Sequence, residues 1–464
     1  MNIKSQQAKN SFLFIFIYLC SLSLQPAFAT QSKKVITTDI WAATATVFKL
    51  VGEKAVNNVK LNWMQREDAD LYKIYRDGNC IGEAKGNTYD DYNLKADKTF
   101  TYHVEAFKEG KKIATSASQQ ATTFTPSGET KIYDNLNGKY ITKESIKKPQ
   151  GMKIGDLYFS YKMENVEKEI DGQTLKGWLA TESFSPTGLD GSWSASRELA
   201  FYPNVKFEGI AFRYNAKTGK VVLSAHYEDQ SGYVAAKIYL AQITPKGELE
   251  VGTMERPLGH ESRDQSLFID DDGTAYLLSA TNMNRDINIY KLDTSWTKPV
   301  LLVNTICKGL HRETPAIIKK DGEYYFFSSK ASGWYPSQTM YTSATDLGGE
   351  WTPMREIGNN STFDAQFNRI STVGKTCGVW SYHWGAQRKY KTPDGNFPRI
   401  SIAAFNKGYA SMDYYRYLEF SDKYGIIPVQ NGRNLTLNVP VTAAVPGARG
   451  IKADCITDGA CTES

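Results

Sequence analysis

Acidic side chains recur at equivalent places in a repeated sequence pattern, each just before an apolar run. Glu208, Asp264 and Glu313 hold three of these places, and Gln366 holds the corresponding place in a later copy. Side chains of this kind at the starts of strands that share a centre would converge without being close in sequence. The chemistry that such a cluster supports is proton transfer to and from a bound molecule.

Glu313 has the surroundings of a general acid. It precedes Pro315 and an apolar strand, so its carboxyl group is poorly solvated, which raises its pKa and lets it stay protonated. The alternative is a structural ion pair of Glu313 with Arg312 or Arg263. The run Asp270–Asp272 beside a glycine is expected to be a solvated hairpin tip instead.

The elements that must position these residues form a repeat. Each copy reads as a polar residue, an apolar run, a glycine turn and an aromatic strand, and successive turn glycines lie roughly fifty to sixty residues apart. The first copy begins weakly at Gln150, and the turn glycines are Gly155, Gly219, Gly273, Gly322 and Gly374. This period predicts an all-β chain with a five-bladed β-propeller over residues 131–435, whose innermost strands line a central shaft.

A smaller all-β module precedes the repeat. Residues 59–63 alternate with a period of two, residues 72–79 read as a strand and a hairpin turn, and residues 101–106 alternate again. Short strands at this spacing favour a sandwich. Residues 38–125 resemble a fibronectin type III domain with Trp63 in its core, which implies a spacer or docking element. Residues 123–130 read as the linker.

Both ends of the chain carry segments without propeller character. Residues 1–29 combine lysines, a short apolar run and an Ala-Phe-Ala site, which is the pattern of a secretory signal peptide. We therefore expect a secreted or periplasmic protein with no integral membrane segment after cleavage. Residues 440–464 lose the periodicity and read as a tail.

The charge and the cysteines exclude other classes. The formal net charge is +5, a balance that predicts no nucleic acid partner. Five cysteines follow the signal segment, and an odd number argues against a disulfide framework. Cys455 and Cys461 could close a loop in the tail, and free buried thiols are expected at Cys80, Cys307 and Cys377.

Aromatic and histidine side chains add candidate contacts. Trp334 and Tyr335 follow an aromatic strand at a loop, where they could stack on a bound ligand or pack between blades. His226 and His383 end two strands and are expected to be hydrogen-bonded shaft residues. The residues predicted to bind substrate are Glu208, Arg263, Trp334 and Tyr335.

Two segments resemble glycoside hydrolase family 43. Residues 262–276 read Ser-Arg-Asp-x-Ser-Leu-Phe-x-Asp-Asp-Asp-Gly-x-Ala-Tyr, and residues 312–325 read Arg-Glu-x-Pro-Ala-Ile-x-Lys-Lys-Asp-Gly-x-Tyr-Tyr. They are similar to the third and fourth blades of that family, whose members are five-bladed propellers that invert anomeric configuration. The resemblance implies that Glu313 is the general acid and that Asp264 tunes its pKa. It requires no cofactor, although a calcium or sodium ion occupies the shaft in several members.

The branch that the chain resembles is that of the exo-β-1,3-galactanases. The shared features are the Ser-Arg-Asp motif, Glu208 before a turn at residues 214–220, and Gln366. The resemblance implies that Gln366 holds the attacking water, as an imidic-acid tautomer, because residues 147–152 lack the first-blade aspartate of the wider family. An inverting enzyme separates its acid from the group that holds this water by roughly 6.5 to 9.5 Å.

Three departures keep other functions open. Glu208 is followed by Gly-Ile and not Arg-Pro, the first blade lacks a His-Gly-Gly-Gly stretch, and residues 382–385 differ from the Met-Gly-Asp-Arg-Trp-like segment. The leading hypothesis is an enzyme that releases terminal galactose from a polysaccharide or oligosaccharide. The alternatives are a family member that acts on arabinose, xylose or an algal galactan unit, and a non-catalytic glycan-binding propeller.

Overall fold

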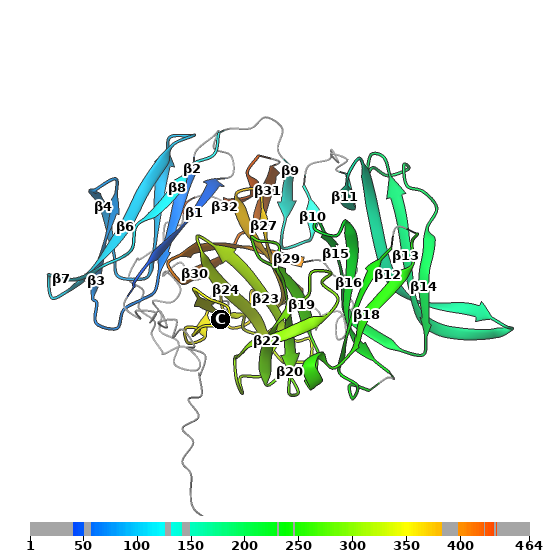
Figure 1. Ribbon diagram of the computed structural model, residues 1–464. Coiled ribbons are helices and arrows are strands. Elements are labelled where there is room, and N and C mark those ends of the chain that lie inside the picture. The colour runs from blue at the N-terminus through cyan, green and yellow to red at the C-terminus, as the bar shows by residue number, and fades with distance from the viewer. Residues whose placement is uncertain are drawn as a thin grey trace, which may run out of the picture. The chain divides into compact units, whose positions relative to one another are not determined.

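The computed structural model of this chain consists almost entirely of strands (Figure 1). It describes residues 40–50, 57–125, 131–141, 149–229, 232–244, 246–382, 398–421, 423–430 and 433. In these ranges the one helical element is the short 3₁₀ turn η1 (Pro257–Gly259). No helix in the described ranges is long and apolar enough to cross a membrane. The predicted signal segment 1–29, the tail 440–464 and His383 lie outside the described residues.

Five antiparallel sheets of four strands each follow one another along the chain. The first sheet holds β11 (Met152–Ile154), β12 (Leu157–Ile170), β13 (Gln173–Ser185) and β14 (Arg197–Pro203). The second holds β15 (Lys206–Asn215), β16 (Lys220–Glu228), β17 (Lys237–Ile243) and β18 (Leu249–Glu255). The third holds β19 (Gln265–Ile269), β20 (Ala275–Thr281), β21 (Asp286–Leu292) and β22 (Pro299–Ile306). The fourth holds β23 (Arg312–Lys320), β24 (Glu323–Lys330), β25 (Met340–Ala344) and β26 (Arg355–Glu356), and the fifth holds β27 (Gln366–Val373), β28 (Thr376–Tyr382), β29 (Pro398–Asn406) and β30 (Tyr409–Tyr414).

The five predicted turn glycines all lie between the first and second strands of these sheets. Each has a positive φ, from 59° at Gly155 and Gly374 to 82° at Gly322, which only glycine adopts at no steric cost. The glycines therefore set the length of each first strand. That length in turn fixes where the polar residue at the strand's other end lies.

Consecutive sheets pack face to face through apolar clusters. Phe207 lies in a cluster with residues of the first sheet, and Leu267 lies in one with residues of the second. Ile317 packs with the third sheet, and Phe367 with the fourth. The first strands also meet in succession, β15 with β19, β19 with β23 and β23 with β27. The order and strand number are those of propeller blades, and closure of the five sheets into a ring remains a prediction.

The module before the repeat is a two-sheet sandwich. One sheet contains β1 (Ala43–Leu50), β2 (Asn57–Trp63) and β5 (Thr88–Leu94). The other contains β3 (Leu71–Arg76), β4 (Asn79–Ala84), β6 (Thr99–Lys108), β7 (Lys111–Thr115) and β8 (Gln119–Thr122). Trp63 is fully buried in the core between them, as expected. The likeness to a fibronectin type III domain and the domain boundaries remain predictions.

The sandwich is joined to the rest of the chain by a continuous sheet. Strand β1 pairs in parallel with β32 (Gly425–Gln430), and the same sheet continues through β31 (Tyr417–Ser421), β9 (Lys131–Asp134) and β10 (Lys139–Tyr140). Backbone pairing of this kind does not fit a spacer on a flexible tether. The linker predicted for residues 123–130 also begins too early. Phe124 is 5% exposed, and its ring lies 5.0 Å from that of Tyr424.

Two smaller predictions need correction. Asp270 is not a solvated hairpin tip, because its carboxylate accepts hydrogen bonds from Lys319 Nζ at 2.7 Å and from the Tyr324 hydroxyl at 2.6 Å. It thus connects the third sheet to the fourth. Cys80, Cys307 and Cys377 are free thiols as expected, but Cys80 is exposed and only Cys377 is fully buried.

Replacing Lys49 by methionine should destabilise the chain by about 3 kcal/mol, because one partner of a buried ion pair is lost. Lys49 Nζ lies 2.9 Å from Glu419 Oε2, and the Glu419 side chain is 5% exposed. Urea unfolding measures the change. Lys112→Met is the control, since its pair with Glu105 is solvated, with Lys112 52% exposed. Equal midpoints for Lys49→Met and the parent would contradict the prediction.

Candidate active site

Four of the predicted polar residues lie at the start of the first strand of their sheets. Glu208 is in β15, Asp264 directly precedes β19, Glu313 is in β23 and Gln366 begins β27. Because these first strands contact one another in succession, their leading side chains meet. Gln150 does not join them: it is exposed, and its backbone N–H donates to the Gly188 carbonyl at 2.7 Å.

Glu313 lies at the centre of this cluster. Its Oε1 accepts a hydrogen bond from Gln366 Nε2 at 2.5 Å, and its Oε2 lies 3.5 Å from Asn284 Nδ2. Burial and the nearby charge of Asp264 raise the pKa of Glu313 to about 7, although the Gln366 hydrogen bond opposes the rise. A carboxyl group with this pKa is still partly protonated at neutral pH.

The alternative ion pairs of Glu313 are not formed. The Arg312 guanidinium donates to the Ser328 carbonyl at 2.5 Å and to the Gln338 carbonyl at 3.0 Å. Arg263 Nε donates instead to Glu261 Oε2 at 3.3 Å. Neither arginine therefore neutralises Glu313 by direct contact.

Asp264 connects the third sheet to the residue that follows Glu313. Its Oδ2 accepts hydrogen bonds from the Thr314 backbone N–H at 3.1 Å and from the Thr314 hydroxyl at 3.2 Å. Burial raises the pKa of Asp264, and the hydrogen bonds from Thr314 act in the opposite direction. The charge of Asp264 in turn contributes to the raised pKa of Glu313.

The backbone around Glu313 is irregular where its side chain must be aimed. The pairing of β23 with β24 shifts between Glu313 and Ala316, and Thr314 has a φ of +54°. A positive φ is rare for a β-branched residue, and such outliers persist only where surrounding contacts hold them. The two hydrogen bonds from Thr314 to Asp264 are contacts of that kind.

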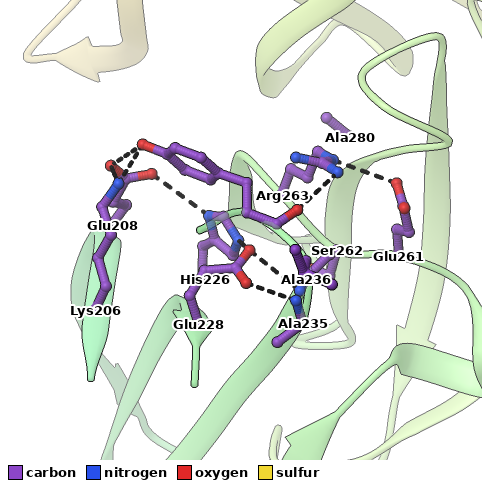
Figure 2. Close-up of polar contacts among 12 residues, drawn as sticks. Lys206, Glu208, His226, Glu228, Ala235, Ala236, Glu261, Ser262, Arg263 and Ala280 are labelled. Carbon is purple, nitrogen blue, oxygen red and sulfur yellow. Dashed lines mark hydrogen bonds and ion pairs between the residues drawn. The ribbon is translucent and has the colours of Figure 1, made fainter. Parts of the chain in front are cut away.

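Glu208 has surroundings opposite to those of Glu313. Tyr233 donates its hydroxyl to Oε1 at 2.7 Å, Lys206 Nζ lies 2.9 Å from Oε1, and His226 Nδ1 lies 3.6 Å from Oε2 (Figure 2). Burial alone would raise the pKa of Glu208, but hydrogen bonds from His226, Lys206 and Tyr233 outweigh it and lower the pKa to about 2. Glu208 is therefore ionised throughout the neutral range.

The other residues predicted to bind substrate occupy different positions. Arg263 directs its guanidinium to Glu261 and to the Tyr233 carbonyl, which accepts from Nη2 at 3.2 Å (Figure 2). Trp334 and Tyr335 follow β24 in an exposed loop and are 41% and 61% exposed. The same loop reaches the site, because the Ser332 backbone hydrogen bonds to Glu313. This position is compatible with stacking on a sugar.

The expected separation between acid and water-holding group is absent. Gln366 Nε2 lies 2.5 Å from Glu313 Oε1, whereas an inverting enzyme places the two groups roughly 6.5 to 9.5 Å apart. The distance is short because the Gln366 amide N–H donates a hydrogen bond directly to the Glu313 carboxyl group. The role of Gln366 as the water-holding residue remains a prediction.

Several site residues escaped the sequence analysis. They are Lys206, Tyr233, Asn284 and Thr314. Lys206 lies two positions before Glu208, so the period of two along a strand places both side chains on one face. This spacing could have identified Lys206 as a neighbour of Glu208 from the sequence. His226 is hydrogen-bonded as predicted, with Nε2 2.7 Å from Glu228 Oε1.

The prediction of a metal ion in the shaft remains open. In the ranges that the structure describes, no group of three or more His, Cys, Asp and Glu side chains could hold a metal ion. His383, the residue considered for such an ion, lies outside those ranges.

Comparison with known proteins gives a family match over part of the chain. No curated protein matches it. Solved structures that it resembles include an exo-β-1,3-galactanase from Clostridium thermocellum. The two sequences are 25% identical, the match covers 64% of this chain and 67% of that chain, and the TM-score is 0.48. Another is an exo-β-1,3-galactanase from Phanerochaete chrysosporium, with 23% identity, 63% and 67% covered, and a TM-score of 0.47. Residues 250–375, which include Asp264, Glu313 and Gln366, match the model of glycosyl hydrolases family 43.

Proposed function

We propose that this chain is an inverting, exo-acting glycoside hydrolase that releases terminal galactose from a β-galactan. The observation that carries the proposal is the difference in pKa between carboxyl groups of one cluster, about 2 for Glu208 and about 7 for Glu313. Glu313 keeps a proton near neutral pH, as an acid that assists bond cleavage must, while Glu208 stays ionised and can accept hydrogen bonds from sugar hydroxyls. The family match over residues 250–375 supports a carbohydrate substrate.

Each residue of the cluster then has one role. Glu313 gives its proton to the oxygen of the leaving group as the bond from that oxygen to the sugar carbon breaks. Asp264 keeps this proton on Glu313, since its charge raises the Glu313 pKa. Glu208 accepts hydrogen bonds from hydroxyls of the terminal sugar, and Trp334 and Tyr335 stack on the sugar that leaves.

Inversion also requires that Gln366 and Glu313 separate when a sugar enters. The water would then lie on the face of the sugar opposite Glu313 and be held by Gln366 in its imidic-acid tautomer. The imine nitrogen of this tautomer takes the proton of the water, and its hydroxyl group releases a proton to solvent, which restores the carboxamide. The hydrogen bond of Gln366 with Glu313 is between side chains, so rotation about side-chain bonds is enough to open it. No cofactor takes part in these steps.

The choice of galactose rests on the motifs shared with the exo-β-1,3-galactanases around Asp264, Glu208 and Gln366. The departures after Glu208 and in residues 382–385 make arabinose, xylose and algal galactan units the competing substrates. The signal pattern of residues 1–29 supports a secreted or periplasmic location, where a polysaccharide is accessible.

A non-catalytic glycan-binding protein is the second candidate. It is favoured by the 2.5 Å distance between Gln366 Nε2 and Glu313 Oε1, which leaves no room for an attacking water. Such a protein would bind galactan or its oligosaccharides and release no sugar even after long incubation.

Incubation with β-1,3-galactan should release galactose, whose first-formed anomer is the inverted one. Glu313→Gln should lower kcat by about 10²- to 10⁴-fold and leave binding measurable, because the variant cannot donate the proton. Product chromatography and NMR of the anomeric proton measure both effects, with arabinan, xylan and algal galactan as parallel substrates. Glu323→Gln, at the other end of the β23–β24 hairpin, is the control. Full activity of Glu313→Gln would refute the acid assignment.

The rate should fall as the pH rises through about 7, because only protonated Glu313 can act as the acid.

Gln366→Leu removes a hydrogen bond that stabilises the Glu313 carboxylate. The Glu313 pKa should therefore rise, and the alkaline limb of the pH–rate profile should move to higher pH. If Gln366 also holds the water, the maximal rate falls as well. Initial rates between about pH 5 and pH 9 test this. An alkaline limb at the same pH in Gln366→Leu and the parent would contradict the prediction that the Gln366 hydrogen bond lowers the Glu313 pKa.

A further inference from the structure

Glu228 is a buried carboxylate beside the cluster for which the proposed reaction gives no role. It is the last residue of β16 and is 1% exposed. Its Oε1 lies 2.7 Å from His226 Nε2 and accepts from the Ala236 N–H at 3.1 Å, and its Oε2 accepts from the Ala235 N–H at 2.7 Å (Figure 2). A charge this deeply buried is stable only when it is fully hydrogen-bonded.

The contact with Glu228 Oε1 fixes the His226 ring. Glu208 lies opposite His226 and Lys206 lies opposite Glu228 in the β15–β16 register, so all four side chains are on one face of the ribbon. Glu228 holds Nε2 of the 2% exposed His226 ring. The other nitrogen, Nδ1, is thereby turned toward Glu208 Oε2, 3.6 Å away.

The other two contacts of Glu228, with the N–H groups of Ala235 and Ala236, fix the segment that carries Tyr233. Residues 232–236 form no regular structure, but Arg256 donates to the Val234 and Ala235 carbonyls at 2.9 and 3.0 Å. Arg263 donates to the Tyr233 carbonyl at 3.2 Å, and Glu228 accepts from Ala235 and Ala236. Two arginines thus hold carbonyl groups of the segment and Glu228 holds two of its N–H groups, and the Tyr233 hydroxyl reaches Glu208 at 2.7 Å.

We propose that Glu228 is the positioning residue of the terminal-sugar subsite: by holding both His226 and the segment that ends at Ala236, it places two of the three side chains that surround the Glu208 carboxylate. The inference rests on the proposed function, in which Glu208 binds the terminal sugar. Glu228 acts through Glu208 and makes no contact with the sugar itself. Arg263 has a related part, because it holds the same segment through the Tyr233 carbonyl.

A double-mutant cycle on sugar binding tests the proposal. All variants carry Glu313→Gln, so that galactose and β-1,3-galactobiose bind without turnover, and calorimetry gives Kd. Glu228→Ala should weaken binding by about 10- to 100-fold, the equivalent of one charge-assisted hydrogen bond. In a Glu208→Ala background it should have almost no further effect, because residues that act through one another are not additive. Glu228→Gln, which keeps acceptors for part of the network, should lie between.

The matched control is Asp229→Asn, since Asp229 adjoins Glu228 and makes a solvated ion pair with Lys237 at 3.0 Å. It should bind like the parent. Loss of affinity on Glu228→Ala that is equally large with and without Glu208 would overturn the positioning role, because the effect would then be one on general stability.

Hydrogen exchange separates this proposal from the function on which it rests. In Glu228→Ala the amides of Ala235 and Ala236 should exchange faster than in the parent, whether or not a sugar binds. Unchanged exchange would overturn the positioning role. If the Glu313→Gln parent binds neither sugar, the proposed substrate is wrong, and the place of the Tyr233 hydroxyl in a crystal structure of Glu228→Ala decides the positioning role alone.

Discussion

Repulsion between carboxylates is the constraint on which this site depends. Glu208, Asp264 and Glu313 lie in one partly buried cluster, and three full negative charges there would repel one another strongly. The structure resolves this by unequal hydrogen bonding. Glu208 receives a tyrosine hydroxyl, an ammonium and an imidazole, whereas Glu313 receives an amide from Gln366 and a long contact from Asn284. These donors lower the pKa of Glu208, whereas burial and the charge of Asp264 raise the pKa of Glu313.

The sheets deliver these groups through irregularities in otherwise regular strands. The register shifts after Glu208 in β15, after Glu313 in β23 and after Phe367 in β27. A bulge re-aims the side chain beside it, and in all three strands it lies within a few residues of a predicted site residue. Glycine turns at the far ends of the same strands keep the remainder in register, so the distortion stays local to the site.

Much of this arrangement could be predicted from the sequence, because it is local. Gly219, Gly273 and Gly322 mark turns, and the apolar runs that precede them identify the strands that bring Glu208, Asp264 and Glu313 to one end. The errors concern partners that are distant in the chain. Asp270 reads as solvated until Lys319 is seen beside it, and the contact of Arg263 with the Tyr233 carbonyl joins residues 30 positions apart. Tyr233 lies in an irregular segment with no periodicity, so no pattern pointed to it.

The parallel pair of β1 and β32 has a consequence for the order in which the molecule can assemble. Lys49 pairs with Val429, so this sheet joins two neighbouring strands that are synthesised nearly a whole chain apart. Contacts of such long sequence separation form slowly, since the loop-closure entropy is lost before any pairing compensates for it. Until β32 emerges, one edge of β1 stays open to pairing with other chains. The open edge of β1 therefore persists for most of the synthesis of the chain, and pairing of this edge with other chains is the hazard that the topology carries.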